Sequence, residues 1–512
     1  MGGVIRNKVA RVLSGALVGF DGALIEVETD MKSGLPGLQI VGMGNKAIDE
    51  ARQRVRSAVS NSLLDFPAQK ITVNLAPAEL PKDGTHLDLP IALSVLVASG
   101  QLKQTEVDRA LFAGELALDG SIRPIRGAVL LAELARTSGA TRIFLPLQNA
   151  PQAQLAQNLE VIGVGNLKDL YGVLKGLVLP TKALSLPGYT PQPSTTSKKS
   201  ALPTFDDIIG HEQAKRALTI AAAGRHNLLL SGSPGAGKTL LAKSLANILP
   251  ALTDKETVEV TKLYSLASGD DGAIYTTPPF RAPHHSVTLP ALIGGGLRPR
   301  PGDVSLAHKG VLFLDELPEY PRIVLEALRQ PLEERAVRLS RLYGYIIYPA
   351  DVLLVATMNP CPCGYLGDQS VQCTCSAAQV STYQKRVSGP LLDRIDLRIT
   401  VSKVKHEHFF NSKSSTEKQH IKVLGAVRNA RKAQALRYNR SDFYNAYASV
   451  EDARNLFKIM PDAKKLLDQA TTQLSLTTRG YLKTLRVART IADLNTSPTV
   501  TSIHIAEALQ YR

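Results

Sequence analysis

The sequence predicts an α/β protein of several domains with a parallel sheet at its centre. Between residues 205 and 401, short apolar runs typical of buried strands alternate with helical patterns, an order that favours a parallel sheet with helices on both faces. Residues 402–512 keep a helical pattern, which predicts a helical domain. Residues 1–177 mix strand-like and helical stretches, and 512 residues exceed the length of one ordinary domain.

The N-terminal region is separated from the rest by a stretch without apolar periodicity. ALIEVET (23–29) and KITVNL (70–75) have strand character, whereas NKAIDEARQRVRSAVSN (45–61) has helical spacing. Residues 178–204 are rich in Pro, Ser, Thr and Lys, which predicts a linker.

The composition is that of a soluble globular protein, with 44% hydrophobic and 21% charged residues. A formal net charge of +15 favours polyanionic partners such as DNA, because Lys and Arg release counterions from phosphates. The sequence has no run of about 18 apolar residues, so no membrane-spanning helix is expected. The first thirty residues run into a strand pattern and do not resemble a signal peptide, so the expected compartment is the cytoplasm.

A phosphate-binding loop is the most specific motif of the chain. HNLLLSG (226–232) is typical of a buried strand, and GSPGAGKT (232–239) opens a helix that stops at Pro250. This is G-x-x-x-x-G-K-[ST] in a strand–loop–helix setting, which predicts ATP binding through backbone N–H groups. Lys238 is expected to reach the β- and γ-phosphates, and Thr239 to bind Mg²⁺. The predicted nucleotide-binding residues are Gly232, Ser233, Pro234, Gly235, Ala236, Gly237, Lys238, Thr239 and Asp315.

Two further apolar strands end in polar residues that complete an ATP site. GVLFLDEL (310–317) carries Asp315, expected to hold the Mg²⁺ directly or through water, and Glu316, expected to orient the attacking water. DVLLVATMNP (351–360) ends with Asn359, which is placed to touch the γ-phosphate or that water.

All four cysteines fall within fifteen residues, as two C-x-C pairs separated by nine residues. Such pairs can converge on a tetrahedral zinc site, and four thiolates would make that site structural. Disulfides are the alternative, which a reducing cytoplasm disfavours. The expected zinc ligands are Cys361, Cys363, Cys373 and Cys375.

Two insertions carry arginines suited to phosphate contacts. The first, residues 279–310, has flexible glycines and is a candidate pore loop. The second, residues 333–351, alternates apolar and polar residues around a turn near Gly344 and predicts a β-hairpin. An ordinary solvated hairpin is the alternative. The expected DNA contacts are Arg281, Arg298, Arg300, Arg338 and Arg341.

The order of these motifs resembles the AAA+ superfamily over roughly residues 204–512. FDDIIGHEQAKRAL (205–218) is similar to the family's segment beside the adenine, and Asn359 matches sensor 1. SGPLLDRIDL (388–397) is similar to the segment that supplies an arginine finger in the MCM and magnesium-chelatase branch. The resemblance implies that Arg394 acts on the ATP of a neighbouring subunit, so that the chain forms a ring.

For each of the two candidate catalytic arginines, the sequence allows an alternative interpretation. Arg394 could instead pair with Asp393 or Asp396 of its own chain. Arg479, in LTTRGYLKTLR, matches the sensor-2 arginine, and Arg486 is the competing choice. The predicted catalytic set is therefore Glu316, Asn359, Arg394 and Arg479.

Nearly the whole chain resembles the ComM/YifB family of magnesium-chelatase-like AAA+ proteins. The motifs that carry this resemblance are PFRAPHHS, PRPGDVSLAHKGVLFLDEL, NPCPCG and LLDRIDL, together with IVGMGNKAIDEARQRVRSAVSNS and GELALDGSIRPIRG in the N-terminal half. The resemblance implies a hexameric DNA helicase that drives branch migration when transformed DNA is integrated. The runner-up is a protein-remodelling or chelatase-type motor with the same ATPase core.

The N-terminal domain resembles the Lon-protease proteolytic fold without its catalytic dyad. His86 stands where the nucleophilic serine is expected, and Val129 where the lysine is expected. Since the dyad needs both residues, proteolysis is not expected. The implied architecture is a Lon-like α+β domain, an AAA+ α/β core and a C-terminal helical lid.

Overall fold

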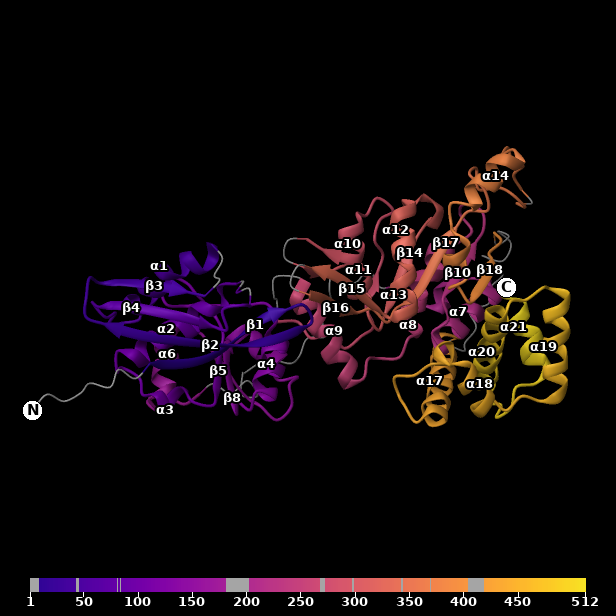
Figure 1. Ribbon diagram of the computed structural model, residues 1–512. Coiled ribbons are helices and arrows are strands. Elements are labelled where there is room, and N and C mark those ends of the chain that lie inside the picture. The colour runs from indigo at the N-terminus through magenta and orange to yellow at the C-terminus, as the bar shows by residue number, and fades with distance from the viewer. Residues whose placement is uncertain are drawn as a thin grey trace, which may run out of the picture. The chain divides into compact units, whose positions relative to one another are not determined.

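A computed structural model describes the chain as two compact units (Figure 1). The first comprises Met1–Thr195, Asp254–Thr276 and Ser340–Tyr348, and the second comprises Thr196–Thr253, Thr277–Leu339 and Pro349–Arg512. Most of the expected linker lies outside the described residues. The structure describes residues 9–42, 46–80, 82, 84–180, 202–267, 272–296, 299–341, 344–368, 370–403 and 419–512.

The first unit is built on a seven-stranded mixed sheet of order β3-β4-β2-β1-β5-β8-β9. A long antiparallel pair, β1 (Ala10–Val18) and β2 (Asp21–Lys32), forms its middle, and β5, β8 and β9 continue it in parallel. The alternating burial along β2 and β4 is the period expected of strands with one covered face. The other strands of this sheet and the longer helices of the unit are β3 (Gly37–Val41), β4 (Lys70–Ala76), β5 (Ala110–Phe112), β8 (Arg142–Pro146), β9 (Glu160–Val164), α1 (Lys46–Asn61), α2 (Asp88–Ala98), α4 (Ala128–Thr137) and α6 (Leu167–Leu174).

A helix from the middle of the sequence packs within this first unit. Lys262 of α9 (Asp254–Ala267) donates to Glu133 of α4 at 2.7 Å, and the Ser265 hydroxyl accepts from the Gly127 amide at 2.8 Å. The sequence placed residues 205–401 in one domain, whereas the compact units divide that range.

The second unit contains the five-stranded parallel sheet that the sequence predicts. Its order is β11-β14-β17-β10-β18, so β17 (Leu353–Met358) lies between β14 (Val311–Leu314) and β10 (Leu228–Ser231). All four pairings are parallel, with Leu228 opposite Val355 and Leu314 opposite Ala356. The strands therefore end at one edge. The remaining bounds are β11 (Phe280–Arg281), β18 (Leu397–Thr400), α7 (Glu212–Gly224) and α8 (Lys238–Ile248).

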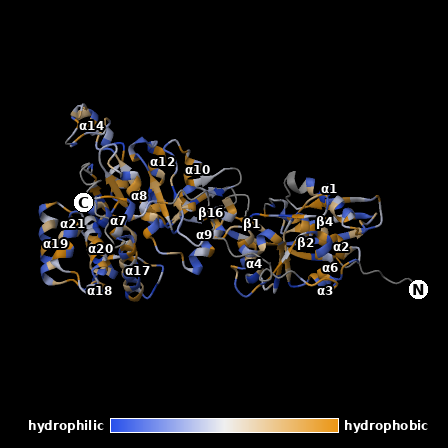
Figure 2. Ribbon diagram, turned by 180° about the vertical axis from the view of Figure 1, so that it is seen from behind, coloured by the Kyte–Doolittle hydropathy of each residue, from blue (hydrophilic) through white to orange (hydrophobic). Residues whose placement is uncertain are grey.

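Apolar strands make this sheet the centre of the unit (Figure 2). Helix α7 lies against β10 and β18, and α8 lies against β17. The C-terminal helical region shares the same core, because buried Val427 and Ile491 belong to one cluster with Leu228 and Leu241. That region consists of α17 (Gln419–Tyr438), α18 (Val450–Leu456), α19 (Pro461–Gln473), α20 (Thr478–Leu494) and α21 (Ser502–Leu509).

The fold class is thus confirmed as mixed α/β with a parallel sheet and a C-terminal helical region. The second insertion forms the expected hairpin, from β15 (Ala336–Arg341) and β16 (Gly344–Pro349). Among the described residues, no helix combines the length and the apolar character needed to cross a bilayer.

A buried carboxylate joins several segments of the second unit. Asp351, just before β17, accepts from Lys309 Nζ at 2.9 Å and from the Tyr447 hydroxyl, and Arg225 Nε lies 3.8 Å away. Burial alone would raise the pKa of Asp351, but Arg225 and Lys309 hold it well below its usual range. The carboxylate is therefore charged, buried and paired.

Removing this carboxylate should destabilise the second unit. Asp351→Ala would remove the carboxylate with which Arg225 and Lys309 both pair in a buried setting, and breaking a buried ion pair typically costs about 3–5 kcal/mol. Urea titration followed by circular dichroism should show the loss, whereas Glu451→Ala, at an exposed position on α18, should cost less than about 1 kcal/mol. Equal midpoints for the two variants would contradict the structural role of Asp351.

Candidate nucleotide-binding site

The P-loop connects β10 to α8 and is shaped by glycines. Gly235 and Gly237 both have φ of +78°, a conformation that disfavours other residues. A Cβ at Gly232 would collide with the Val401 carbonyl oxygen, so the loop begins where two backbones meet closely. Lys238 starts α8 directly after Gly237, which leaves the first helical N–H groups directed at the loop.

The Lys238 ammonium lies at the centre of the site. Its Nζ donates to the carbonyl oxygens of Gly232 at 2.6 Å and Ser233 at 3.0 Å, and to Asn359 Oδ1 at 3.0 Å. Burial lowers the pKa of Lys238, and the charges of Asp315 and Glu316 oppose that shift. The structure thus brings the expected P-loop lysine and the expected sensor asparagine into direct contact.

The metal-binding and water-orienting candidates meet at the end of β14. Thr239 Oγ1 donates to Asp315 Oδ2 at 3.1 Å. Glu316 follows Asp315 directly, is exposed to solvent, and has a φ of +55°. A threonine hydroxyl and a carboxylate side by side are oxygen ligands of the kind that Mg²⁺ prefers.

Thr357 is a site residue that the sequence analysis missed. Its hydroxyl donates to Asp315 Oδ1 and accepts from the Glu316 amide at 3.0 Å, so it fixes both acidic residues. A signal existed: Thr357 is a polar residue within the apolar run of β17. Its role becomes visible only when Leu314 is known to pair with Ala356.

The two candidate catalytic arginines converge on one glutamate. Arg394 donates to Glu333 and to the carbonyl oxygens of Arg329 (3.0 Å) and Pro390 (2.7 Å), and its side chain is 11% exposed. Arg479 Nη2 lies 3.8 Å from Glu333 Oε1. Arg394 therefore pairs within its own chain, with Glu333 and not with Asp393 or Asp396.

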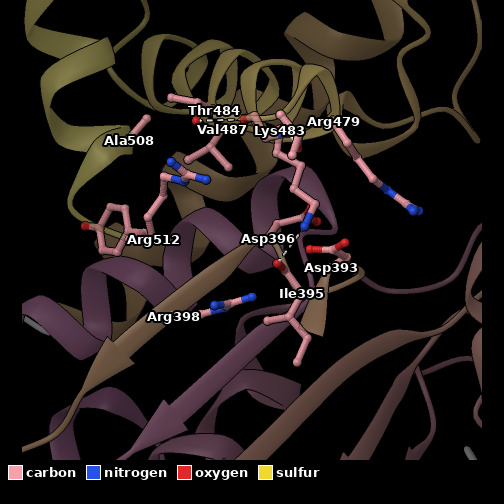
Figure 3. A pocket seen from close by; sticks show the side chains of 13 residues that line it. Asp393, Ile395, Asp396, Arg398, Arg479, Lys483, Thr484, Val487, Ala508 and Arg512 are labelled. Atoms are coloured by element: carbon pink, nitrogen blue, oxygen red, sulfur yellow. Dashed lines mark hydrogen bonds between the residues drawn. The ribbon is translucent and has the colours of Figure 1, made fainter. Parts of the chain in front are cut away.

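The competing arginine has a different environment. Arg486 Nε donates to the Ala448 carbonyl at 2.7 Å, and burial lowers its pKa. Arg479 instead lines a cavity of about 150 Å³ at the start of α20, where several charged side chains face one another (Figure 3). The other charged residues of this cavity are Asp393, Asp396, Arg398, Lys483 and Arg512.

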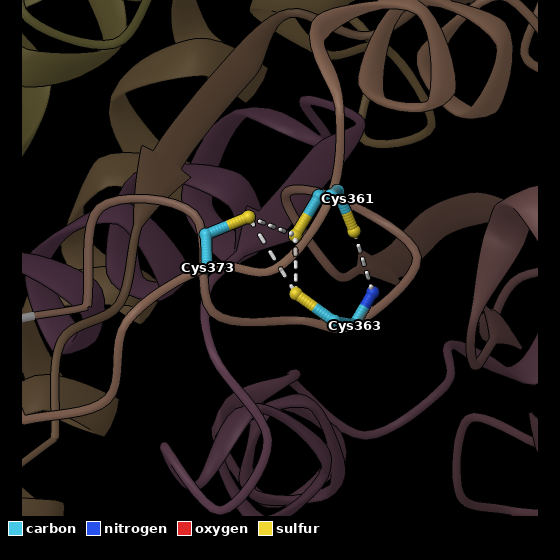
Figure 4. Close-up of side chains that lie close together, drawn as sticks. Cys361, Cys363 and Cys373 are labelled. Atoms are coloured by element: carbon cyan, nitrogen blue, oxygen red, sulfur yellow. Dashed lines mark hydrogen bonds between the residues drawn. The ribbon is translucent and has the colours of Figure 1, made fainter.

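The four cysteines converge as the spacing predicts, and Figure 4 labels three of them, Cys361, Cys363 and Cys373. All four Sγ atoms lie within 4.8 Å of one another, and Cys361 is 3.4 Å from Cys363 and 3.7 Å from Cys373. These separations exceed a disulfide bond of about 2.05 Å, so the thiols are free. Hydrogen bonds from backbone amides lower the pKa of Cys363, whereas burial and the neighbouring thiols raise the pKa of Cys373 and Cys375. The convergence of the four sulfur atoms is therefore the observation that fits zinc.

The five candidate DNA-contacting arginines have different surroundings. Arg281 pairs with Asp303, with Nε 2.9 Å from Oδ1, and Arg338 pairs with Glu334 at 2.7 Å. Arg300, on β13 (Arg300–Pro301), is exposed. Arg298 and the side chain of Arg341 lie outside the described part of the chain.

The two positions that would carry a proteolytic dyad are buried. His86 Nε2 lies 2.8 Å from the Gly15 carbonyl oxygen, and burial lowers the pKa of His86. Val129 is an apolar core residue of α4. Arg54, on the helix that carries Arg52 and Arg56, pairs with buried Asp88 at 2.7 Å.

Family models match most of the chain. They describe the magnesium chelatase subunit ChlI over residues 204–409, subunit ChlI of Mg-chelatase over residues 27–149, and its C-terminal part over residues 417–512. The magnesium-chelatase 67 kDa subunit of Chlorobaculum parvum is 28% identical over 30% of this chain and 23% of its own length.

Several relatives match along nearly the full length of the chain. Competence protein ComM of Haemophilus influenzae is 41% identical over 98% of this chain and 97% of its own. YifB of Escherichia coli is 39% identical over 97% of this chain and 96% of its own. With the P-loop, Asp315 and Asn359 gathered at one sheet edge, these similarities imply ATPase activity that uses Mg²⁺. The chain belongs to the ComM/YifB family of magnesium-chelatase-like AAA+ proteins.

Proposed function

We propose that this protein is a cytoplasmic, ring-forming ATPase, assembled as a hexamer, that acts as a DNA helicase. It would migrate branched junctions when incoming DNA recombines during natural transformation. The observation that carries the proposal is the site at the edge of the parallel sheet, where Lys238 contacts Asn359 and Thr239 contacts Asp315. The full-length similarity to a competence protein supports the biological setting.

The residues of the site divide the work of ATP hydrolysis between them. The P-loop amides and Lys238 would hold the phosphates, and Asn359 would fix Lys238 and contact the γ-phosphate or the attacking water. Thr239 and Asp315 would hold Mg²⁺, which neutralises charge on the phosphates when bound. Glu316, exposed and anchored through Thr357, would orient the water.

Arg394 would complete the site of a neighbouring subunit. Its guanidinium is already ordered by Glu333 and two carbonyl oxygens. To engage the ATP of a neighbouring subunit, Arg394 would have to exchange the Glu333 carboxylate for a phosphate of that ATP. Arg479 shares Glu333 and would serve as the sensor-2 arginine. Because Arg394 and Arg479 share Glu333, a movement of the Glu333 carboxylate would release both arginines together.

The positive charge of the chain and its exposed arginine and tyrosine side chains favour DNA over a protein as the substrate of the motor. The chain carries a net charge of +15, Arg300 is exposed, β15 carries Arg338, and Tyr345 of β16 is 76% exposed. Exposed aromatic rings stack on bases, and cations contact phosphates, in proteins that bind single-stranded nucleic acids. Arg281 would need to leave Asp303 to contact a phosphate. The alternative, a protein-remodelling or chelatase-type motor, rests on the family models.

We also propose that Cys361, Cys363, Cys373 and Cys375 bind one structural zinc ion. Convergence of four sulfur atoms within 4.8 Å supports it, because a tetrahedral thiolate site needs that geometry.

The proposed function predicts junction migration that depends on Glu316. With ATP and Mg²⁺, the protein should convert a synthetic four-way junction into its products, and branched DNA should raise ATP turnover. Glu316→Gln should bind ATP and assemble but hydrolyse it at least about a hundred-fold more slowly, because the water loses its orienting group. Turnover by Glu316→Gln at the parent rate would refute that role, and turnover indifferent to DNA would favour a protein client.

Subunit mixing tests whether Arg394 acts in trans. Arg394→Ala should bind ATP but lose roughly 10³–10⁵ in hydrolysis rate, as other arginine fingers do. Lys238→Ala should lose nucleotide binding. When subunits exchange, an Arg394→Ala chain can receive the finger of a Lys238→Ala neighbour, so mixtures should hydrolyse more ATP than either variant alone. Proven exchange without recovered activity would count against a finger acting between adjacent subunits.

Metal analysis tests the cysteine site. Protein purified without chelators should contain about one zinc per chain. Cys373→Ser should lower that content and destabilise the loop between residues 361 and 375, whereas a matched Ser376→Ala change outside the ligand set should not lower it. Parent protein without zinc would refute the four-thiolate site.

A further inference from the structure

Helix α17 of the C-terminal region carries cations but no carboxylates. Its 20 residues contain neither aspartate nor glutamate, and they contain Lys422, Arg428, Arg431, Lys432 and Arg437. Helices α18, α19, α20 and α21 of the same region each contain at least one acidic residue. Opposite charges three or four residues apart stabilise a helix, and α17 lacks such pairs. The cations of α17 therefore serve contacts outside the helix.

Two of these cations have partners within the fold. Arg431 donates to the Ser441 carbonyl oxygen at 2.9 Å, and its guanidinium lies 3.3 Å from the ring centre of Tyr444. Arg437 Nη1 donates to Asp493 Oδ2 at 2.8 Å, and the side chain of Asp493 is buried. Both arginines thus hold α17 against neighbouring segments of the second unit, and their charges are used there.

Arg428 and Lys432 have no partner of this kind. Both are exposed, and they lie four residues apart, which places them on one face of the helix. Within the part of the chain that the structure describes, neither side chain forms a hydrogen bond or an ion pair. The carboxylates of Asp206 and Glu212 contact the first two residues of α17, about 12 Å along the helix axis from Arg428. Neither cation lies in the last turn, so the helix dipole does not account for them.

This exposed face suits the phosphates of a nucleic-acid duplex. The exposed residues of α17, which we call the α17 face, are Ile421, Lys422, Arg428, Asn429, Lys432 and Leu436. None of them is aromatic, so the face offers no ring on which unpaired bases could stack. Its affinity for DNA therefore depends on charge density, and a duplex carries about twice the charge of a single strand per unit length.

The apolar residues of the α17 face do not form a patch. Ile421 is 59% exposed and Leu436 is 86% exposed, but they lie about 22 Å apart along the helix axis, with the cations between them. Single exposed apolar side chains are ordinary on protein surfaces, whereas protein partners bind contiguous apolar patches. The charge of the face thus favours a polyanion over a protein.

We propose that the α17 face binds the phosphate backbone of a double-stranded arm of the DNA, through Arg428 and Lys432. The inference rests on the DNA substrate proposed above, and it adds a surface outside the two arginine-bearing insertions. Helix α17 packs against α8, whose first residue is Lys238. A duplex held on α17 is therefore connected to the nucleotide site through a single contact between helices.

The first experiment measures binding of a fluorescein-labelled duplex to the full chain by anisotropy, with ATPγS and Mg²⁺, between about 50 and 200 mM salt. The double variant Arg428→Ala, Lys432→Ala should bind at least about ten-fold more weakly at low salt, because two phosphate contacts are lost. The slope of log K against log salt should become shallower by at least about 1.8, since each contact contributes about 0.9. Arg428→Lys, Lys432→Arg keeps both charges and should bind close to the parent.

A matched control removes the same charge elsewhere in the helical region. Lys464→Ala, Lys465→Ala changes two exposed lysines of α19, a helix that also carries acidic residues, and should alter duplex affinity less than about two-fold. Equal losses in the two double variants would mean that net charge alone matters, and would overturn the role of the α17 face. If the alanine variant of α17 melts earlier than the parent by circular dichroism, Arg428→Gln, Lys432→Gln tests the same charges with longer side chains.

The second experiment replaces the duplex with a single-stranded oligo(dT). The variant Arg428→Ala, Lys432→Ala should lose less than about two-fold on the single strand, where stacking on aromatic side chains supplies more of the affinity. An equal loss on both ligands would overturn the assignment to a duplex arm. Parent protein that binds neither ligand would refute the DNA substrate itself. Parent protein that binds the duplex no more tightly than the α17 variant would overturn the α17 face alone.

Discussion

The site depends on the parallel register of three neighbouring strands. Because β17 lies between β14 and β10, the residues that follow them, Asn359, Asp315 and the P-loop, meet at one edge of the sheet. The hydrogen bond from Lys238 to Asn359 links the loop after β10 to the end of β17. The Thr357 hydroxyl links β17 to Asp315 and Glu316, which follow β14. A slip in this register would separate the residues proposed to hold the phosphates from those proposed to hold the metal.

Short sequence patterns predicted those strands, helices and turns that are determined by residues close together in the chain. The apolar runs before Gly232 and Asp315 became β10 and β14, and the helix after the P-loop is α8. The hairpin at Gly344 and the gathering of the four cysteines also followed from short spacing. In each case the deciding residues lie within about fifteen positions of one another, so turn chemistry, periodicity and ligand spacing are enough.

Contacts between distant segments escaped prediction because nothing in their local pattern marks them. Glu333 is an ordinary polar residue of α13 (Arg329–Glu334) until the fold brings Arg394 against it. Gly364 is an ordinary loop glycine in the sequence, and only the fold shows that it packs against Pro234 of the P-loop. Helix α9 lies within the range that the sequence assigned to the ATPase core, yet it packs with α4 of the first unit through Lys262. Such pairings depend on tertiary arrangement and not on propensity.

The surroundings of the proposed finger bear on how a ring would control hydrolysis. A flexible exposed arginine loses side-chain entropy, up to about 2 kcal/mol, when it engages a phosphate. Arg394 has already lost that freedom, since its side chain is mostly buried and two carbonyl oxygens position the guanidinium. In the proposed ring, the remaining free-energy cost of engaging a neighbour's ATP is the separation of Arg394 from Glu333. The nucleotide carries more negative charge than one carboxylate, so its attraction for the guanidinium can offset this electrostatic cost. Hydrolysis would then respond to the charge state of the adjacent site, because ATP and ADP differ in the phosphate that competes with Glu333.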